Sequence, residues 1–175
     1  QGVSSAASDV YKRQEEMGTF RSFDFGSLGR ITNNDVFIYR KAVHRERFEV
    51  DKLPKNVPLF KCYAGMDASL LEAASKTGID GVVVEAMGVG NVPPPVYYRL
   101  VEMVQSHIPV VLVSRCPVGR TEHVYAYEGA GKHLYDAGVI FADFLNGQKA
   151  RIKLMCALGA GKSIEEIRKS MEWMA

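Results

Sequence analysis

Apolar residues in this chain gather in short continuous runs, each flanked by turn residues. Residues 81–84 (Gly-Val-Val-Val) and 109–113 (Pro-Val-Val-Leu-Val) contain no alternating polar positions. This pattern is typical of strands that are buried on both faces, as in a parallel sheet. Residues 59–63 and 139–141 are two further runs of this kind. The hydrophobic pattern therefore predicts about four strands after residue 58.

Between the first three runs, the apolar positions change to helical spacing. Two helices are predicted, over residues 67–77 and 94–105. Prolines 93–95 support the second start, because proline is tolerated at the beginning of a helix and not inside one. The inward-facing residues that the spacing predicts are Leu70, Leu71 and Ala74 in the first helix, and Val96, Leu100, Met103 and Val104 in the second.

Three more helices are predicted, over residues 132–136, 147–158 and 164–174. Asn146 is expected to cap the second of them, with Ile152, Met155 and Cys156 facing inward. Ser163 and Glu166 have the spacing of a capping box at the start of the last one.

Strands alternating with helices predict an α/β fold, because parallel strands need crossover helices. We expect a three-layer domain over residues 53–175, with a small parallel sheet of about four strands flanked by helices. Residues 15–52 are interpreted as a strand segment and connector, with a hairpin-like turn at 33–35. Residues 1–14 resemble translated adaptor sequence that recurs in metagenomic reading frames. They are interpreted as a non-native, disordered tail.

Composition narrows the function classes. The chain has 175 residues, is 47% hydrophobic and carries a formal net charge of +2. A near-neutral balance points to neither nucleic acid nor a membrane surface as a partner. Three cysteines without metal-ligand spacing predict no metal site and fit a reducing compartment, so the expected location is the cytoplasm. Cys62 and Cys156 lie in apolar runs and are interpreted as core thiols.

Candidate chemistry gathers after the strand at residues 80–85. Gly88, Gly90 and Asn91 follow it, and ligands bind at such carboxyl ends of strands in open α/β sheets. The alternative is that the glycines only make a tight turn. Glu85, at the strand end, needs a partner if it is buried, and Arg115 is a candidate. The loop at 116–133 is long, polar and tyrosine-rich, which favours a functional role.

Two further stretches imitate phosphate-binding loops. Residues 159–163 (Gly-Ala-Gly-Lys-Ser) and 129–132 (Gly-Ala-Gly-Lys) carry the end of the P-loop pattern, but Cys156 and Ala126 stand where its first glycine belongs. Nucleotide binding is therefore not favoured.

Four segments in register resemble the C-terminal part of bacterial L-asparaginases. They are residues 23–31, 81–91, 114–119 and 146–155. The resemblance implies an amidohydrolase that converts L-asparagine, and more slowly L-glutamine, to the acid and ammonia without a cofactor. It also implies a homodimer or homotetramer in which this domain closes a neighbouring subunit's active site. The family's catalytic threonines lie in Thr-Gly-Gly-Thr and Thr-Asp-Thr motifs, and neither occurs here, so this chain is expected to have no catalytic residues and no activity alone.

The resemblance assigns substrate contacts to three residues. Asn91 matches the family's asparagine after the glycine-rich turn. Glu128, with Tyr127 as the alternative, matches the glutamate that binds the substrate's α-amino group. Two rival functions stay open: a glutamine-dependent tRNA amidotransferase subunit of the same superfamily, and a non-catalytic assembly domain. For Asn91, the alternative role is capping the helix after Pro93.

Overall fold

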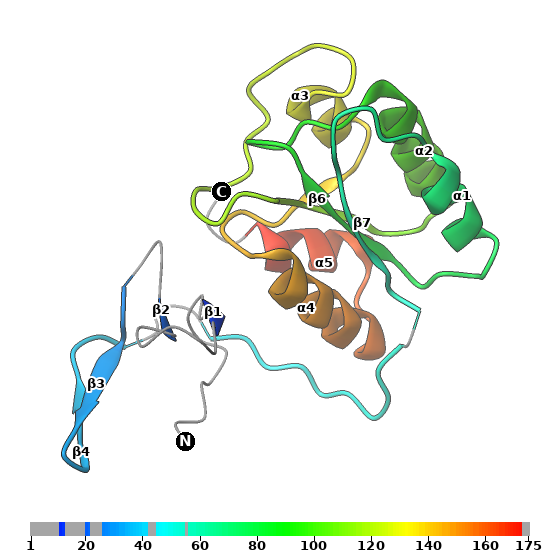
Figure 1. The fold of residues 1–175 in the computed structure, drawn as a ribbon. Coiled ribbons are helices and arrows are strands. Elements are labelled where there is room, and N and C mark those ends of the chain that lie inside the picture. Colours follow the sequence, from blue (N-terminus) through cyan, green and yellow to red (C-terminus); the bar gives the residue numbers. More distant parts are fainter. Residues whose placement is uncertain (1–10, 13–19, 22–25, 42–44, 55, 173–175) are drawn as a thin grey trace. The chain divides into compact units, whose positions relative to one another are not determined.

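The computed structural model describes residues 11–12, 20–21, 26–41, 45–54 and 56–172. These residues belong to two compact units, residues 1–47 and 48–175, and each is described by itself. The boundary lies close to the one predicted at residue 52. The second unit holds the sheet, the helices and the candidate site (Figure 1).

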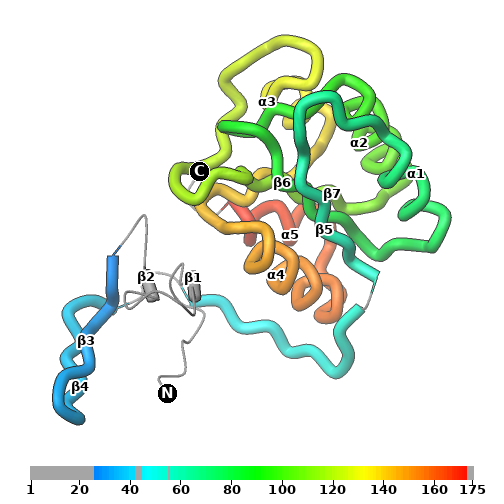
Figure 2. Tube along the Cα trace, in the orientation of Figure 1, coloured from blue at the N-terminus to red at the C-terminus, as the bar shows by residue number. Residues whose placement is uncertain are grey.

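The second unit is built on a four-stranded parallel sheet in which neighbours in sequence are neighbours in space (Figure 2). Its strands, in spatial order, are β5 (Leu59–Lys61), β6 (Val82–Ala86), β7 (Val110–Ser114) and β8 (Ile140–Phe141). Three helices connect them, namely α1 (Ser69–Ser75), α2 (Pro94–Gln105) and α3 (Gly131–Asp136). The predicted α/β fold and parallel sheet are thus confirmed.

Helices cover both faces of this sheet, which makes the predicted three layers. Alternate residues of β6 point to opposite faces: Val82 and Val84 join the cluster that includes α1, α2 and α3. Val83 joins the cluster on the other face, formed with α4 (Gly147–Gly159) and α5 (Ile164–Met171). Because every β6 residue is buried, the continuous apolar run is explained by packing on two sides.

Two helical faces were predicted wrongly. Leu70 is 54% exposed and Ile152 is 52% exposed, although both were expected to face inward. In α4 the buried stripe runs through the small residues Gly147, Ala150 and Ala157 together with Leu154 and Met155. Small side chains let a helix approach the sheet closely, so hydrophobicity alone identified the wrong face.

The predicted partner of Glu85 is also corrected. Glu85 is buried, as expected, but its carboxylate pairs with Lys61 at 3.2 Å. The parallel register sets Lys61 directly beside Glu85. Arg115 instead donates a hydrogen bond to the Cys62 carbonyl at 2.9 Å. A Cβ at Gly147 would overlap the Glu85 carboxylate, so the absent side chain lets α4 begin against this charge.

The first unit contains the expected hairpin. Strands β3 (Gly29–Thr32) and β4 (Asp35–Ile38) pair antiparallel. Asn33 and Asn34 both have positive φ, 48° and 75°, as the twist-matched two-residue hairpin turn requires. The backbones of β1 (Tyr11–Lys12) and β2 (Phe20–Arg21) also pair. Most of residues 1–14 lie outside the described residues, and their assignment as a tail stays a prediction.

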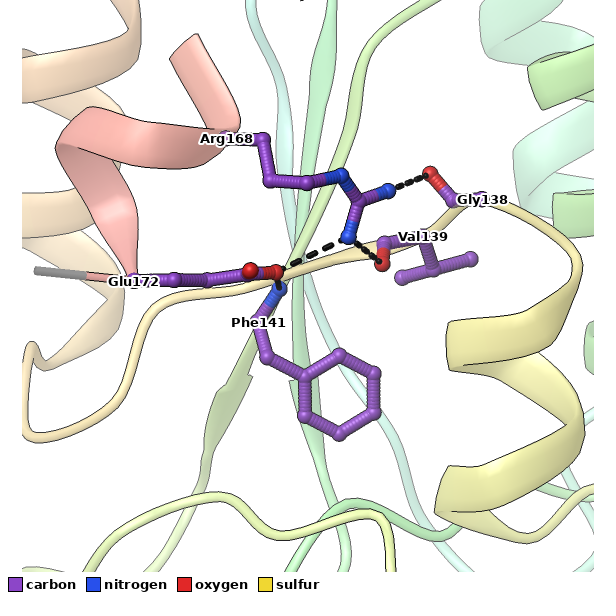
Figure 3. A network of polar contacts seen from close by, with 5 residues as sticks. All are labelled: Gly138, Val139, Phe141, Arg168 and Glu172. Carbon is purple, nitrogen blue, oxygen red and sulfur yellow. Dashed lines mark hydrogen bonds and ion pairs between the residues drawn. The ribbon is translucent and has the colours of Figure 1, made fainter. Parts of the chain in front are cut away.

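A charged network joins α5 to β8 (Figure 3). Arg168 pairs with Glu172 at 2.9 Å and donates to the carbonyls of Gly138 and Val139. The Glu172 carboxylate also accepts a hydrogen bond from the Phe141 backbone amide at 3.2 Å. The end of α5 is thereby held against the last strand. Within the part of the chain that the structure describes, no helix has the length and apolar character to cross a membrane.

Both predicted helix caps are present. The Asn146 side chain accepts from the Lys149 amide, and Ser163 and Glu166 form a reciprocal capping box at the start of α5. The box satisfies amides at the helix start that have no partner within the helix.

We expect Ser163→Ala to lower the free energy of unfolding by about 1 kcal/mol, because the Glu166 amide loses its acceptor. Ser106→Ala is the matched control, since the Ser106 hydroxyl only donates to the Glu102 carbonyl at the exposed end of α2. Urea unfolding of both variants measures the difference. Equal stability of the two variants would contradict a stabilising box.

The same box gives a pH prediction. A hydrogen bond from Lys162, aided by the Ser163 amide, lowers the pKa of Glu166 from 4.5 to about 2. A depressed folded-state pKa means that this stabilisation is complete above pH 4.5 and is lost as the pH falls toward 2. A carbon-detected NMR titration of the Glu166 side chain should find the low pKa, and Lys162→Ala should raise it. A midpoint near 4.5 in the unmodified chain would exclude the Lys162 contact.

Candidate functional site

The turn after β6 is fixed by its own backbone. The Met87 amide donates to the Asn91 carbonyl at 2.8 Å, and the Asn91 amide donates back to the Met87 carbonyl at 2.9 Å. Gly90 has φ of +133°, and a Cβ there would stand 3.1 Å from Leu112 and 3.2 Å from Phe141. The glycine is therefore required by both conformation and close packing. Asn91 leaves this turn at the carboxyl edge of the sheet.

Asn91 does not cap α2. The N-cap of that helix is Pro93, and no side chain bonds to its first amides. The capping alternative for Asn91 is therefore wrong. Asn91 is half-buried, and its Oδ1 atom is buried without a hydrogen-bond partner among the residues described. An unpaired buried amide oxygen is costly, which favours a role outside this chain's own packing.

The long loop at 116–133 is tied to this turn at two points. The Glu122 amide donates to the Val89 carbonyl at 2.7 Å, and the Val92 amide donates to the Gly129 carbonyl at 2.8 Å. A Cβ at Gly129 would overlap the Val92 carbonyl. We call the backbone contact between Val92 and Gly129 the clasp. It brings the residue after Asn91 against the residue after Glu128.

Glu128 is exposed and has a specific partner. The Tyr98 hydroxyl hydrogen-bonds to the Glu128 carboxylate, and this contact raises the pKa of Tyr98. Tyr98 lies in α2, the helix that begins just after the Asn91 turn. Sequence reasoning missed Tyr98, although its position shortly after Asn91 could have suggested it. Tyr127 is 53% exposed, and its ring centroid lies 6.2 Å from that of Tyr125.

The predicted site residues thus fall on two joined loops at one sheet edge. The clasp brings together the segments that carry Asn91 and Glu128, while Tyr127 lies on the open surface next to Glu128. The described side chains are suited to binding a polar ligand, since Asn91 offers an amide and Glu128 a carboxylate.

No metal or thiol chemistry is supported within the described ranges. No group of three or more histidine, cysteine or acidic side chains there could hold a metal ion. Cys62 is fully buried, and burial raises the pKa of its thiol to about 11. A thiol with that pKa is almost entirely protonated at neutral pH and is a poor nucleophile. Cys156, expected in the core, is only partly buried.

Comparison with known proteins gives matches over most of the second unit. The Glutaminase/Asparaginase C-terminal domain family matches residues 56–171. An L-asparaginase of Bacillus licheniformis is 31% identical over 143 residues, covering 82% of this chain and 44% of the relative. A probable L-asparaginase of Deinococcus radiodurans is 35% identical over 148 residues, covering 82% of this chain and 45% of the relative.

A second kind of relative also matches. A glutamyl-tRNA(Gln) amidotransferase subunit from Pyrococcus abyssi is 31% identical over 158 residues, covering 87% of this chain and 35% of that protein. The chain therefore spans less than half the length of the curated relatives it matches. The family match covers the whole sheet and all five helices described above, and the chain belongs to the Glutaminase/Asparaginase C-terminal domain family.

Proposed function

We propose that this domain supplies substrate-binding side chains to an asparaginase-type amidohydrolase. In this proposal Asn91 hydrogen-bonds near the substrate, and Glu128 binds the substrate's α-amino group, with Tyr127 beside it. L-asparagine is the substrate, with L-glutamine as a slower one. The catalytic threonines come from a part of the enzyme outside the matched segment, and the site is completed across subunits of a homodimer or homotetramer.

The observation that carries the proposal is the clasp between the two loops. An amide and a carboxylate that must contact one small zwitterion need fixed positions, because misplacement reduces catalysis steeply. The Val92–Gly129 contact fixes the loop backbones, and Tyr98 holds the Glu128 carboxylate. The buried, unpartnered Oδ1 of Asn91 adds a group that lacks a role within the described part of this chain.

The amidotransferase relatives support a second candidate. Their name is that of a subunit in an enzyme acting on glutamyl-tRNA(Gln), and they are about as similar to this chain as the asparaginases are. Both candidates place amide chemistry at the same sheet edge. A comparison of free L-asparagine and L-glutamine turnover with tRNA-dependent amide transfer separates them. The third candidate, an assembly domain without substrate contacts, predicts that Asn91 is dispensable.

We expect the 175-residue chain alone to release no ammonia from L-asparagine. It contains neither threonine motif of the resembled active site, and side chains that only bind substrate do not supply a nucleophile. Ammonia release is measured against a buffer blank. Turnover that copurifies with the chain through a second column would overturn the division of roles.

Asn91→Ala tests the binding role in an active context. The context is a chimera in which residues 56–171 replace the matching segment of the Bacillus licheniformis L-asparaginase. We expect a roughly ten- to hundredfold loss in kcat/KM, since removing one hydrogen-bond partner of a bound substrate costs on the order of 1–3 kcal/mol. Asn56→Ala is the control within the transferred segment, because it removes amide contacts to Thr77 and Gly78, far along the chain from the turn.

An active chimera whose Asn91→Ala variant keeps full kcat/KM would contradict the proposal and favour the assembly role. An inactive but folded chimera would also count against it. The melting temperature of each variant, measured in parallel, separates loss of folding from loss of binding.

Gly129→Ala tests the clasp in the 175-residue chain. Gly129 and Gly119 have nearly equal φ, +84° and +89°, but only at Gly129 would a Cβ meet another backbone, whereas Gly119 has open space around it. Gly119→Ala should cost roughly 1–2 kcal/mol, from the left-handed conformation alone. Gly129→Ala should cost more than this, by on the order of 1–3 kcal/mol of overlap. Equal unfolding free energies in urea would show that the loops are not held as described.

A further inference from the structure

A second pocket lies beside the end of β8, apart from Asn91 and Glu128. It has a volume of about 420 Å³, which is large enough for a small organic molecule. Its walls come from the loop at 120–124, from Tyr135 of α3, from Phe141 and Asp143, and from Glu172 after α5. The proposed substrate contacts do not use any of these residues.

Two buried polar residues in this pocket are unusual. Asp143 is 8% exposed and has φ of +33°, a conformation that non-glycine residues rarely adopt. Thr121 is 4% exposed, and its hydroxyl is buried without a hydrogen-bond partner within the described residues. The Thr121 amide donates to the Asp143 carbonyl at 3.3 Å, so the two positions are neighbours. Backbone strain and unpaired buried polar atoms both cost stability and cluster at ligand sites.

Carboxylates outnumber cations among the residues that line the pocket. Arg120 pairs with Glu122 at 2.8 Å, and the charge of Asp143 further raises the pKa of Arg120. One guanidinium therefore faces two carboxylates in that corner. The third carboxylate, Glu172, pairs with Arg168, as Figure 3 shows. The lining is thus negative on balance and lies partly inside the fold, where an added cation is attracted strongly.

The opposite wall is aromatic and rigid. The rings of His123 and Tyr135 stack, with centroids 4.4 Å apart and planes at 16°. Phe141 meets both rings edge-on, with centroids 6.1 Å and 5.8 Å away. The Arg168 guanidinium lies 5.3 Å from the centre of the Tyr135 ring, and the Arg168–Glu172 network anchors it to β8. Such a wall binds the apolar body of a ligand and attracts its positive charge.

We propose that this pocket binds a small organic cation, a primary amine with an apolar or aromatic body. The ammonium group hydrogen-bonds in the corner formed by Asp143, Glu122 and Thr121, and the apolar body lies on the His123, Tyr135 and Phe141 rings. A metal ion does not fit these observations, because no cluster in the described ranges has the ligands to hold one. A simple anion does not fit either, since the local charge is negative.

The test uses the 175-residue chain and three probes of one shape. Phenethylamine carries the positive charge, 2-phenylethanol replaces it with a neutral hydroxyl, and phenylacetate reverses it. We expect saturable binding of phenethylamine with Kd below about 10 mM, at least about tenfold weaker binding of 2-phenylethanol, and no binding of phenylacetate. Amide chemical shifts in NMR should change at residues 120–124 and 141–143.

Asp143→Asn is the matched variant, because asparagine keeps the size and tolerates positive φ, so folding should be preserved. It should weaken phenethylamine binding about tenfold or more. Glu102→Gln, which removes an exposed carboxylate paired with Arg99 on α2, is the control and should change nothing. The proposal is overturned by equal binding of amine and alcohol, by unchanged affinity in Asp143→Asn, or by shifts confined to other residues.

Discussion

Burial of β6 on both faces is the constraint on which the rest of this domain depends. Each residue of β6 is buried, β5 and β7 pair on its two edges, and a helical layer packs on each face. A strand held on four sides cannot slip by one residue without turning its whole apolar set to the wrong layer. Its last residue therefore has one position, and so does the turn that leads to Asn91.

The remaining candidate residues are positioned relative to that turn by backbone contacts. The loop at 116–133 has no regular structure before α3, yet the Glu122–Val89 bond and the Val92–Gly129 clasp join it to the edge of the sheet. Backbone bonds of this kind leave the side chains of the loop available for a ligand. The same loop also forms one wall of the second pocket, through residues 120–124. One segment thus contributes to two different surfaces of the domain.

Local chemistry could be predicted from the sequence, whereas packing choices could not. The start of α2 at Pro94 and the caps at Asn146 and Ser163 follow from short-range rules, and each is present. The faces of α1 and α4 depend on how closely a helix approaches the sheet, and small residues decided this for α4. The partner of Glu85 depends on strand register, which places Lys61 beside it. Nothing within one strand specifies its neighbour's register.

The path of the long loop was beyond sequence reasoning for a similar reason. Its length and tyrosine content predicted function, but the clasp requires Gly129 to meet Val92, residues that lie far apart in the chain. Tyr98 became relevant only through that approach. A domain arranged in this way fixes an amide and a carboxylate at a sheet edge and includes none of the resembled family's threonine motifs. In such a domain, rigidity of the two loops is its main contribution, because a partly exposed amide has catalytic value only when its position is set before the substrate arrives.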